Sequence, residues 1–317
     1  MGVYRVRVPN PPLPGRAGAD GVRAEALAWA TSAPLRRLAA AFGGMVPRGP
    51  VTEVLAWLDG FSAAHWDFRG GGERSHAVRR SFDPATSALI TSSADALGLV
   101  RPAPPRLDSY THVLVLGGLF AACLDRTAHA AALLASGTSS PSVTAVGGFR
   151  PLMPAELAEA SSVDAGDCVF EVEAMTVGAR RAFGAGEPST VDAGGDPSAD
   201  PHRAWRVETH HLPDTTVLRV VAAPSSAPAK RRANTPDTCR FWADQVAKLG
   251  AGDRVLVVTS AIYVPFQHCD AVAAFTLPYG AVVDTVGSAP RTPPDADRLL
   301  QEIRSAIRSM RRLVAAL

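Results

Sequence analysis

The chain has little cysteine, and none of it is closely spaced. Its four cysteines are Cys123, Cys168, Cys239 and Cys269. The cysteines of zinc sites and of small disulfide-rich domains recur at short spacings, which this chain lacks. We therefore expect free thiols and no bound metal.

Long apolar runs are also missing. No apolar run in the 317 residues reaches the roughly 18 residues that a membrane-spanning helix needs. The first residues, Met1-Gly2-Val3-Tyr4-Arg5, do not have the apolar core of a signal peptide. We predict a cytoplasmic protein that has no membrane partner.

An excess of charge of one sign is absent too. The 32 basic and 30 acidic residues leave a formal net charge of +2. This argues against a nucleic-acid partner, because binding to phosphate backbones relies on strongly basic surfaces. The 47% of hydrophobic residues are ordinary for a globular protein. We expect a small-molecule substrate as the partner, and a homodimer is compatible with the sequence.

The residue pattern changes near residue 105. Residues 10–105 contain apolar positions at helical spacing, interrupted by glycine and proline, and Asp83-Pro84 is a typical helix start. From residue 106 onward, short apolar strands alternate with helices, which is typical of a parallel sheet covered on both faces. We predict an N-terminal helical subdomain (1–105) followed by a Rossmann-like α/β domain (106–317).

Within the second region, the pattern predicts individual elements. Strands are expected near residues 112–116, 142–146, 216–221, 254–258 and 281–283. Residues 169–183 predict a helix, and Asp295 is expected to cap an amphipathic closing helix. The stretch 184–204 is rich in Gly, Asp, Pro and Ser and is predicted to be a flexible surface insertion.

Two glycine pairs directly follow predicted strands. They are Gly117-Gly118 and Gly147-Gly148. Glycine at such a turn lets the backbone approach a ligand and leaves helix N–H groups available for an anion. The pairs do not form the G-x-G-x-x-G fingerprint, so no standard dinucleotide site is predicted. A tight turn without any ligand explains them equally well.

The segment Asn234-Thr235-Pro236-Asp237 predicts a helix start, with Thr235 as N-cap and Pro236 at the first helical position. This account leaves Asn234 and the preceding cations of residues 230–232 unexplained. Cations beside a helix start suit a phosphate or carboxylate, although a solvated charge run is the commoner outcome. We predict that Asn234 and Thr235 bind a cofactor and that Arg232 binds substrate.

Other candidates are carboxylates and hydroxyls near element ends. Glu171 and Glu173 begin a predicted helix and, being two residues apart, face different directions, so each is a separate acid/base candidate. Thr259 and Ser260 end a strand, where their hydroxyls would line a cofactor cleft, and Tyr263 follows as a catalytic candidate. Acids at helix starts also commonly serve structure alone.

Two further arginines, Arg69 and Arg74, flank a glycine-rich segment in the N-terminal region. Such a segment would serve as a lid whose arginines close over substrate. An exposed turn between helices is the alternative interpretation.

From about Tyr110 to Gly287, the order of these features resembles the ElyC/SanA/YdcF family. The corresponding segments are the strand ending in Gly117-Gly118, the following helix with Arg126, Gly147-Gly148, Glu171-Val172-Glu173-Ala174-Met175, Asn234-Thr235 and Val258-Thr259-Ser260. Tyr263 and Phe266 stand where the family has a histidine and an arginine.

This resemblance implies a Rossmann-like fold and, for Arg126, a role in substrate binding. One branch of the family is associated with S-adenosylmethionine, so the resemblance implies this cofactor, and with it a transferase of bacterial specialised metabolism. The glycine pairs, Asn234, Thr235, Thr259 and Ser260 would then hold an anionic or adenosyl-type ligand. The alternatives are a ligand-binding or regulatory module that has lost its chemistry, and envelope-related glycan or phosphate chemistry.

Overall fold

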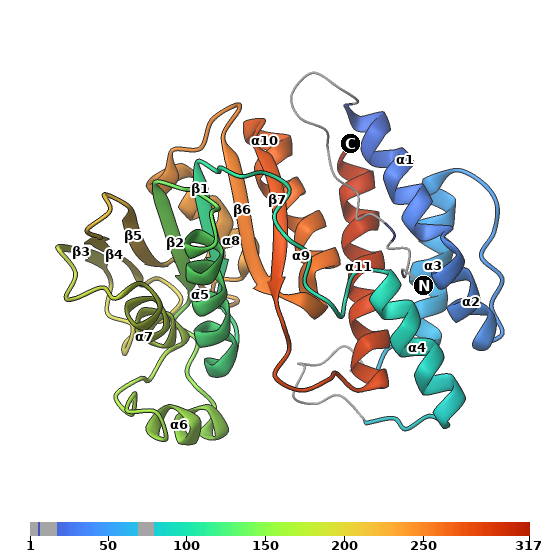
Figure 1. Ribbon diagram of the computed structural model, residues 1–317, viewed down its shortest axis with the longest axis horizontal. Coiled ribbons are helices and arrows are strands. Elements are labelled where there is room, and N and C mark those ends of the chain that lie inside the picture. Colours follow the sequence, from blue (N-terminus) through green and yellow to red (C-terminus); the bar gives the residue numbers. More distant parts are fainter. Residues whose placement is uncertain (1–5, 7–17, 69–78) are drawn as a thin grey trace. The chain divides into compact units, whose positions relative to one another are not determined.

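The computed structural model describes residue 6, residues 18–68 and residues 79–317 (Figure 1). The chain divides into two compact units. Unit 1 comprises Met1–Ala103, Ser260–Leu277 and Ala289–Leu317, and unit 2 comprises Pro104–Thr259 and Pro278–Ser288. A boundary thus lies beside the predicted residue 105, and unit 1 also contains two segments from late in the chain.

Unit 2 is built on a seven-stranded sheet with the order β3-β4-β5-β2-β1-β6-β7. The strands are β1 (His112–Leu116), β2 (Ser142–Gly147), β3 (Thr190–Gly194), β4 (Trp205–His211), β5 (Val217–Ala222), β6 (Arg254–Ser260) and β7 (Val282–Ser288). β1 runs parallel to β2 and β6, and β2 runs parallel to β5. β3, β4 and β5 are joined by antiparallel pairing. The predicted α/β class with a mostly parallel sheet is confirmed.

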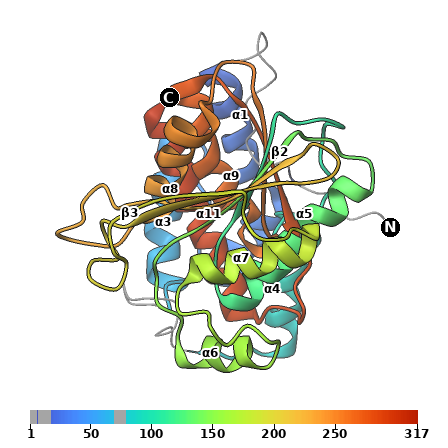
Figure 2. The ribbon, with the colours of Figure 1, turned by 90° about the vertical axis from the view of Figure 1, so that its left-hand side faces the viewer.

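Helices lie against both faces of this sheet. On one face, α5 (Phe120–Ala135) and α7 (Glu171–Phe183) pack on the core side chains Val113, Val115, Val143 and Leu218. Figure 2 shows α7 and the short helix α6 (Pro154–Ser161) on the same side of the sheet. On the other face, α8 (Thr235–Phe241) and the π-helical segment η2 (Trp242–Ala247) contact strand side chains through their aromatic rings.

The segment 184–204 differs from its prediction. It contains the edge strand β3, whose residues are mostly exposed and which pairs antiparallel with β4, a strand that the sequence did not indicate either. Apolar alternation cannot reveal β3, because neither of its faces is buried. Instead, backbone hydrogen bonds to β4 hold β3 in the sheet.

Unit 1 is helical where it is described. Its helices are α1 (Ala19–Ala30), α2 (Ala33–Ala41), α3 (Val51–His65), α4 (Pro84–Ala96), α9 (Val264–Ala271) and α11 (Ala296–Ala316). Unit 1 also contains the shorter elements η3 (Ala261–Tyr263) and η4 (Val272–Thr276), and the three-residue helix α10 (Leu277–Tyr279) begins in unit 1 and continues into unit 2. The predicted apolar stripe of α11 is buried, and this helix packs against α1, α3, α4 and α9.

Helix starts in unit 1 show one confirmed cap and one correction. Asp83 caps α4 by accepting the N–H of Thr86 at 3.0 Å, as predicted. Asp295 precedes α11 but makes no capping hydrogen bond, because its carboxylate pairs with Arg79. Across the described residues, no helix has both the length and the apolar character needed to cross a membrane.

Candidate site at the carboxyl ends of the central strands

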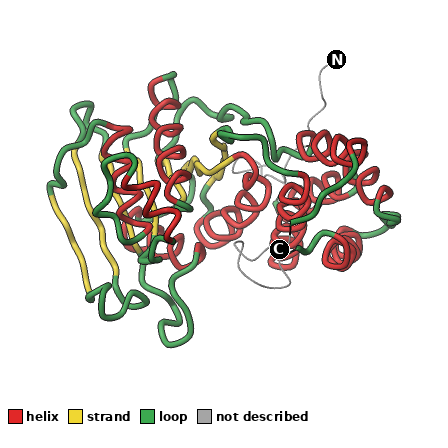
Figure 3. The backbone as a smooth tube through the Cα atoms, turned by 90° about the horizontal axis from the view of Figure 1, so that it is seen from below, coloured by secondary structure: helices red, strands yellow, loops and turns green. Residues whose placement is uncertain are grey.

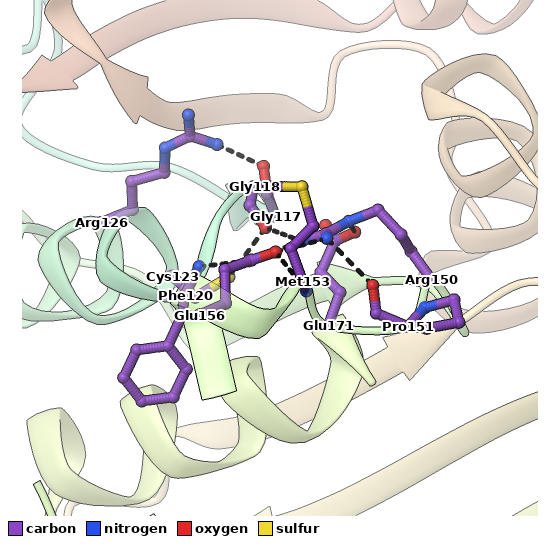
Figure 4. A network of polar contacts seen from close by, with 10 residues as sticks. All are labelled: Gly117, Gly118, Phe120, Cys123, Arg126, Arg150, Pro151, Met153, Glu156 and Glu171. Carbon is purple, nitrogen blue, oxygen red and sulfur yellow. Dashed lines mark hydrogen bonds and ion pairs between the residues drawn. The ribbon is translucent and has the colours of Figure 1, made fainter. Parts of the chain in front are cut away.

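The carboxyl ends of β1 and β2 meet at one edge of the sheet, because the two strands are parallel neighbours. α5 begins two residues after Gly118, and α7 begins at Glu171 beside the end of β2. Ligands of open α/β sheets bind at such an edge. The structure brings together Gly117, Gly118, Arg126 and Glu171 here (Figure 4).

Close approach of α7 explains two of the glycines. A Cβ atom on Gly117 would overlap Oε1 of Glu171 and lie 2.7 Å from the carbonyl oxygen of Val146. A Cβ on Gly147 would lie 3.0 Å from Cα of Val172. Gly148 differs, since a Cβ there would have nothing within 4 Å. Gly117 and Gly147 are therefore required by packing, while open space lies beside Gly148.

Arg150 is the centre of the polar network at this edge. Its Nη1 and Nη2 donate to the two carboxylate oxygens of Glu156 at 2.7 and 2.9 Å, and its Nε donates to Oε2 of Glu171 at 3.1 Å. Nη2 also donates to the carbonyl of Gly118 at 2.9 Å. The Arg150 side chain is 15% exposed and that of Glu156 is 4% exposed. These ion pairs are thus shielded from most of the solvent.

Sequence reasoning missed both Arg150 and Glu156. Glu156 is the third residue of a helix that begins at Pro154, a spacing typical of capping carboxylates. Its Oε2 accepts the N–H of Met153 at 3.0 Å. Arg150 had a weaker signal, as it lies two residues after the second glycine pair. Neither signal shows that the two side chains pair.

Three helix N–H groups at this edge are already hydrogen-bonded within the chain. Oε1 of Glu156 accepts the N–H of Phe120 at the start of α5 at 2.9 Å. At the start of α7, the N–H groups of Glu171 and Val172 donate to the carbonyls of Arg150 and Gly148. These three N–H groups are therefore occupied in this arrangement and do not face an external anion.

Glu171 is the carboxylate of this network that keeps an oxygen for another partner. Burial raises the pKa of its carboxyl, and the charges of Arg150, Arg126 and Arg232 act in the opposite direction. Its Oε1 accepts no hydrogen bond from the residues that the structure describes, and the side chain is 16% exposed. Glu156 differs: burial acts to raise its pKa, but hydrogen bonds from Arg150 and Met153 hold it below the ordinary value.

Glu173 has a different position and role. Its Oε2 accepts the N–H groups of Val169 and Phe170 at 2.5 and 2.9 Å, so it caps the start of α7. The two acids diverge, as their spacing predicted, and they do not form a pair. The structure gives Glu173 a capping function, which accounts for an acid at this position without catalysis.

Two of the predicted substrate-binding arginines lie near Glu171. Arg126 is 2% exposed, and its Nη1 donates to the carbonyls of Leu116 and Gly117, so it holds the end of β1. Arg232 is exposed, and its charge opposes the rise in the pKa of Glu171 that burial causes. Arg69 and Arg74 lie outside the described residues.

The predicted helix start at residues 234–237 needs a correction. The N-cap is Asn234 rather than Thr235: Oδ1 of Asn234 accepts the N–H of Asp237, and Oδ2 of Asp237 accepts the N–H of Asn234, both at 3.1 Å. Arg231 pairs with Asp237, and although burial acts to raise it, the pKa of Asp237 falls to about 2. Capping accounts for Asn234, so its side chain needs no ligand.

The predicted residues at the end of β6 are largely buried. Thr259 is 0% exposed, so its hydroxyl does not line an open cleft. Ser260 is half-buried and precedes η3. Tyr263 belongs to unit 1, is 6% exposed, and its hydroxyl accepts a hydrogen bond from Nη2 of Arg298 at 2.8 Å.

Metal and thiol chemistry have few candidates in the described parts of the chain. No group of three or more His, Cys, Asp or Glu side chains comes together there in a way that could hold a metal ion. All four cysteines are buried free thiols. Burial is the main cause that raises the pKa of Cys123 to about 12.

Comparison with known proteins places this chain among mycobacterial relatives. The Rv3785 N-terminal domain matches residues 14–98. Over 333 aligned residues the chain is 31% identical to "Uncharacterized protein Rv3785" of Mycobacterium tuberculosis, and the match covers 95% of this chain and 92% of that protein. The chain belongs to the Rv3785 family. "Uncharacterized protein Mb3814" of Mycobacterium bovis matches at the same identity and coverage.

The family domain falls within the first segment of unit 1, Met1–Ala103. Because the match to Rv3785 covers 95% of the chain, the similarity extends through the sequence of both units. No solved structure gives a significant match.

Proposed function

We propose that this Rv3785-family chain is a Rossmann-like small-molecule enzyme, a transferase, that binds an adenosyl-type ligand such as S-adenosylmethionine at the carboxyl ends of β1 and β2. The observation that carries the proposal is Oε1 of Glu171, which has no donor among the described residues. We further propose that the enzyme acts in the cytoplasm, in specialised metabolism.

The chemistry of Glu171 favours hydroxyl or amine groups over phosphate. A carboxylate at the carboxyl end of a strand accepts hydrogen bonds from the ribose hydroxyls of nucleotides in Rossmann folds. An ammonium group would also suit Glu171, because a cation beside a carboxylate stabilises the charged form. A phosphate would meet the carboxylates of Glu171 and Glu156, whose negative charges disfavour it. An adenosyl ligand supplies hydroxyls and an amine without a phosphate.

The neighbouring residues have complementary roles in this proposal. Arg150 fixes Oε2 of Glu171, so that Oε1 is presented in one orientation. The open space beside Gly148 would leave room for the bound ligand. Arg232, whose charge acts on Glu171, would face the ligand's carboxylate. The resemblance to the ElyC/SanA/YdcF family supports the same cofactor.

A second candidate function is a ligand-binding module without catalysis. The observation that favours it is that Glu173 caps α7 and that both oxygens of Glu156 already accept hydrogen bonds, so Glu171 has no second carboxylate available for acid/base chemistry. Such a module would bind the same ligand and show no turnover.

The test is ligand-induced stabilisation of the full chain by S-adenosylmethionine and S-adenosylhomocysteine. A ligand at about 100 times its Kd adds roughly 2.7 kcal/mol to the free energy of unfolding. We expect this stabilisation in the wild type and its loss in Glu171→Gln, which keeps the side-chain volume. Glu187→Gln is the matched control, because Glu187 is 80% exposed and lies in a surface pair with Arg180.

Equal stabilisation of wild type and Glu171→Gln would refute the role of Glu171, and no stabilisation of the wild type would refute the ligand class. Stabilisation without transfer of a methyl group to any acceptor in a metabolite extract would favour the binding module.

A further inference from the structure

Unit 2 has a groove on the sheet face opposite α5 and α7. Side chains on β3, β4 and β5 form its floor: Asp192, Trp205, Thr209 and Arg219. Phe241 and Gln245, from α8 and η2, form its wall. The groove measures about 580 Å³, which is within the range of small-molecule sites. We call it the Arg219 groove.

Strand alternation separates this groove from the site at Glu171. Leu218 and Val220 belong to the core beneath α5 and α7, so Arg219 between them points to the opposite face. In the sheet, Arg219 lies between Thr144 of β2 and Thr209 of β4. Figure 3 shows the outermost strands, at the left, extending beyond the neighbouring helices.

Arg219 is half-buried and lacks a counter-ion. No carboxylate pairs with its guanidinium and no acceptor hydrogen-bonds to it among the described residues. Other partly buried arginines of unit 2 do have carboxylate partners: Arg150 pairs with Glu156, and Arg206 pairs with Glu208. A partly desolvated charge without a partner is unfavourable. An anionic group on a bound ligand would pair with this charge and remove the unfavourable free energy.

The other side chains of the groove indicate which kind of ligand the anionic group belongs to. The rings of Trp205 and Phe241 lie 6.0 Å apart and are inclined by 45°, so they present an aromatic surface beside the cation. Thr209 and Gln245 add hydrogen-bonding groups. Asp192 is exposed and also lines the groove, and its charge disfavours a ligand with two negative charges.

We propose that the Arg219 groove binds a small aromatic carboxylic acid, whose carboxylate pairs with Arg219 and whose ring contacts Trp205 and Phe241. The guanidinium fork matches a carboxylate in bidentate geometry. This site is independent of the proposed function at Glu171, because it lies on the other face of the sheet.

The test uses 2-naphthoate as the probe and its uncharged amide, 2-naphthamide, as the matched ligand, with binding to the full chain measured by calorimetry and ligand-observed NMR. We expect the wild type to bind 2-naphthoate at least about tenfold more tightly than 2-naphthamide, the effect of one charge-assisted hydrogen bond. 2-Naphthyl phosphate should bind more weakly than 2-naphthoate because of Asp192.

Arg219→Met should remove the preference for the acid and leave the melting temperature unchanged or higher, because it deletes an unpaired charge at similar volume. Arg203→Met is the control, since Arg203 is 67% exposed and pairs with Asp200.

Unchanged 2-naphthoate affinity in Arg219→Met would overturn the proposal, as would a wild type that binds neither naphthalene ligand. The small-molecule proposal would also be overturned if the chain bound no probe and formed a dimer that the Trp205→Leu substitution dissociates. That result would assign the groove to contact with a second copy of the chain.

Discussion

At the residue scale, one arginine holds two acids that differ in character. Glu156 has no free oxygen, because both of its carboxylate oxygens accept hydrogen bonds from Arg150 and from backbone N–H groups. Glu171 shares Arg150 through one oxygen only. This difference explains why the pKa of Glu156 is lowered and that of Glu171 is raised. A site in which neighbouring acids have opposite pKa shifts is a candidate for acid/base or ligand chemistry.

The raised pKa of Glu171 makes a prediction about stability and pH. Its carboxyl titrates above its ordinary value of 4.5 in the folded chain, so its contribution to stability is complete below pH 4.5 and is lost as the pH rises through the folded-state pKa. We expect the free energy of unfolding of Glu171→Gln, minus that of the wild type, to increase from pH 4.5 towards neutral pH. Urea unfolding across this range measures it.

The control for this measurement is again Glu187→Gln, whose difference from the wild type should stay constant with pH. A Glu171→Gln difference that is flat, or that falls as the pH rises, would contradict the raised pKa.

At the element scale, the packing of α7 on α5 positions the candidate site. The two helices cross closely at Gly178, where a Cβ would lie 2.7 Å from Oγ1 of Thr127 and 3.1 Å from the carbonyl oxygen of Cys123. This contact fixes α7 against the helix that follows β1, and α7 carries Glu171 at its first position. The close contact between the helices therefore determines where the carboxylate lies.

Gly178→Ala tests this packing. Alanine is favoured over glycine inside a helix by roughly 0.5–1 kcal/mol, but overpacking costs about 1–3 kcal/mol. We expect Gly178→Ala to lower the free energy of unfolding. Gly60→Ala in α3 is the matched control, because Gly60 is exposed with nothing within 4 Å of a Cβ, and we expect it to be stabilising. If both variants were stabilised equally in urea unfolding, the close crossing would be refuted.

At the scale of the whole molecule, the two units are discontinuous in sequence. The chain leaves unit 2 after Thr259, returns for Pro278–Ser288, and ends in unit 1 with α11. Within unit 1, α11 packs against α1, α3 and α4, which come from the N-terminal segment. The family domain at residues 14–98 does not contain α11. The core of unit 1 therefore needs residues from both ends of the chain.

We predict that residues 1–98 alone do not fold cooperatively, because the apolar faces that α11 covers would be exposed to water. Circular dichroism during thermal unfolding should show no sigmoidal transition for this fragment. A synthetic peptide of residues 289–317 should increase its helicity, whereas a peptide of the same composition in scrambled order should not. A cooperative transition of the fragment alone would contradict this prediction.

Several elements were predictable because their signals are local. β1 and β6 are nearly continuous apolar runs, since parallel strands that are covered on both faces leave no side for polar residues. The stripe of α11 follows the helical period, and Asp83-Pro84 sets the start of α4. In each case the physical cause lies within a few residues of its effect. The sequence by itself therefore determined the α/β class and most of the buried elements.

The tertiary structure decided the rest, because it depends on which distant segments meet. β3 exists through its pairing with β4 and has no apolar pattern of its own. The link from Arg150 to Glu171 joins positions 21 residues apart, and Asp295 pairs with Arg79 instead of capping α11. Arg219 looks like any arginine in a strand until the fold leaves it without a counter-ion on a groove floor. Burial and ion pairing are properties of the assembled fold, and residue order alone does not contain them.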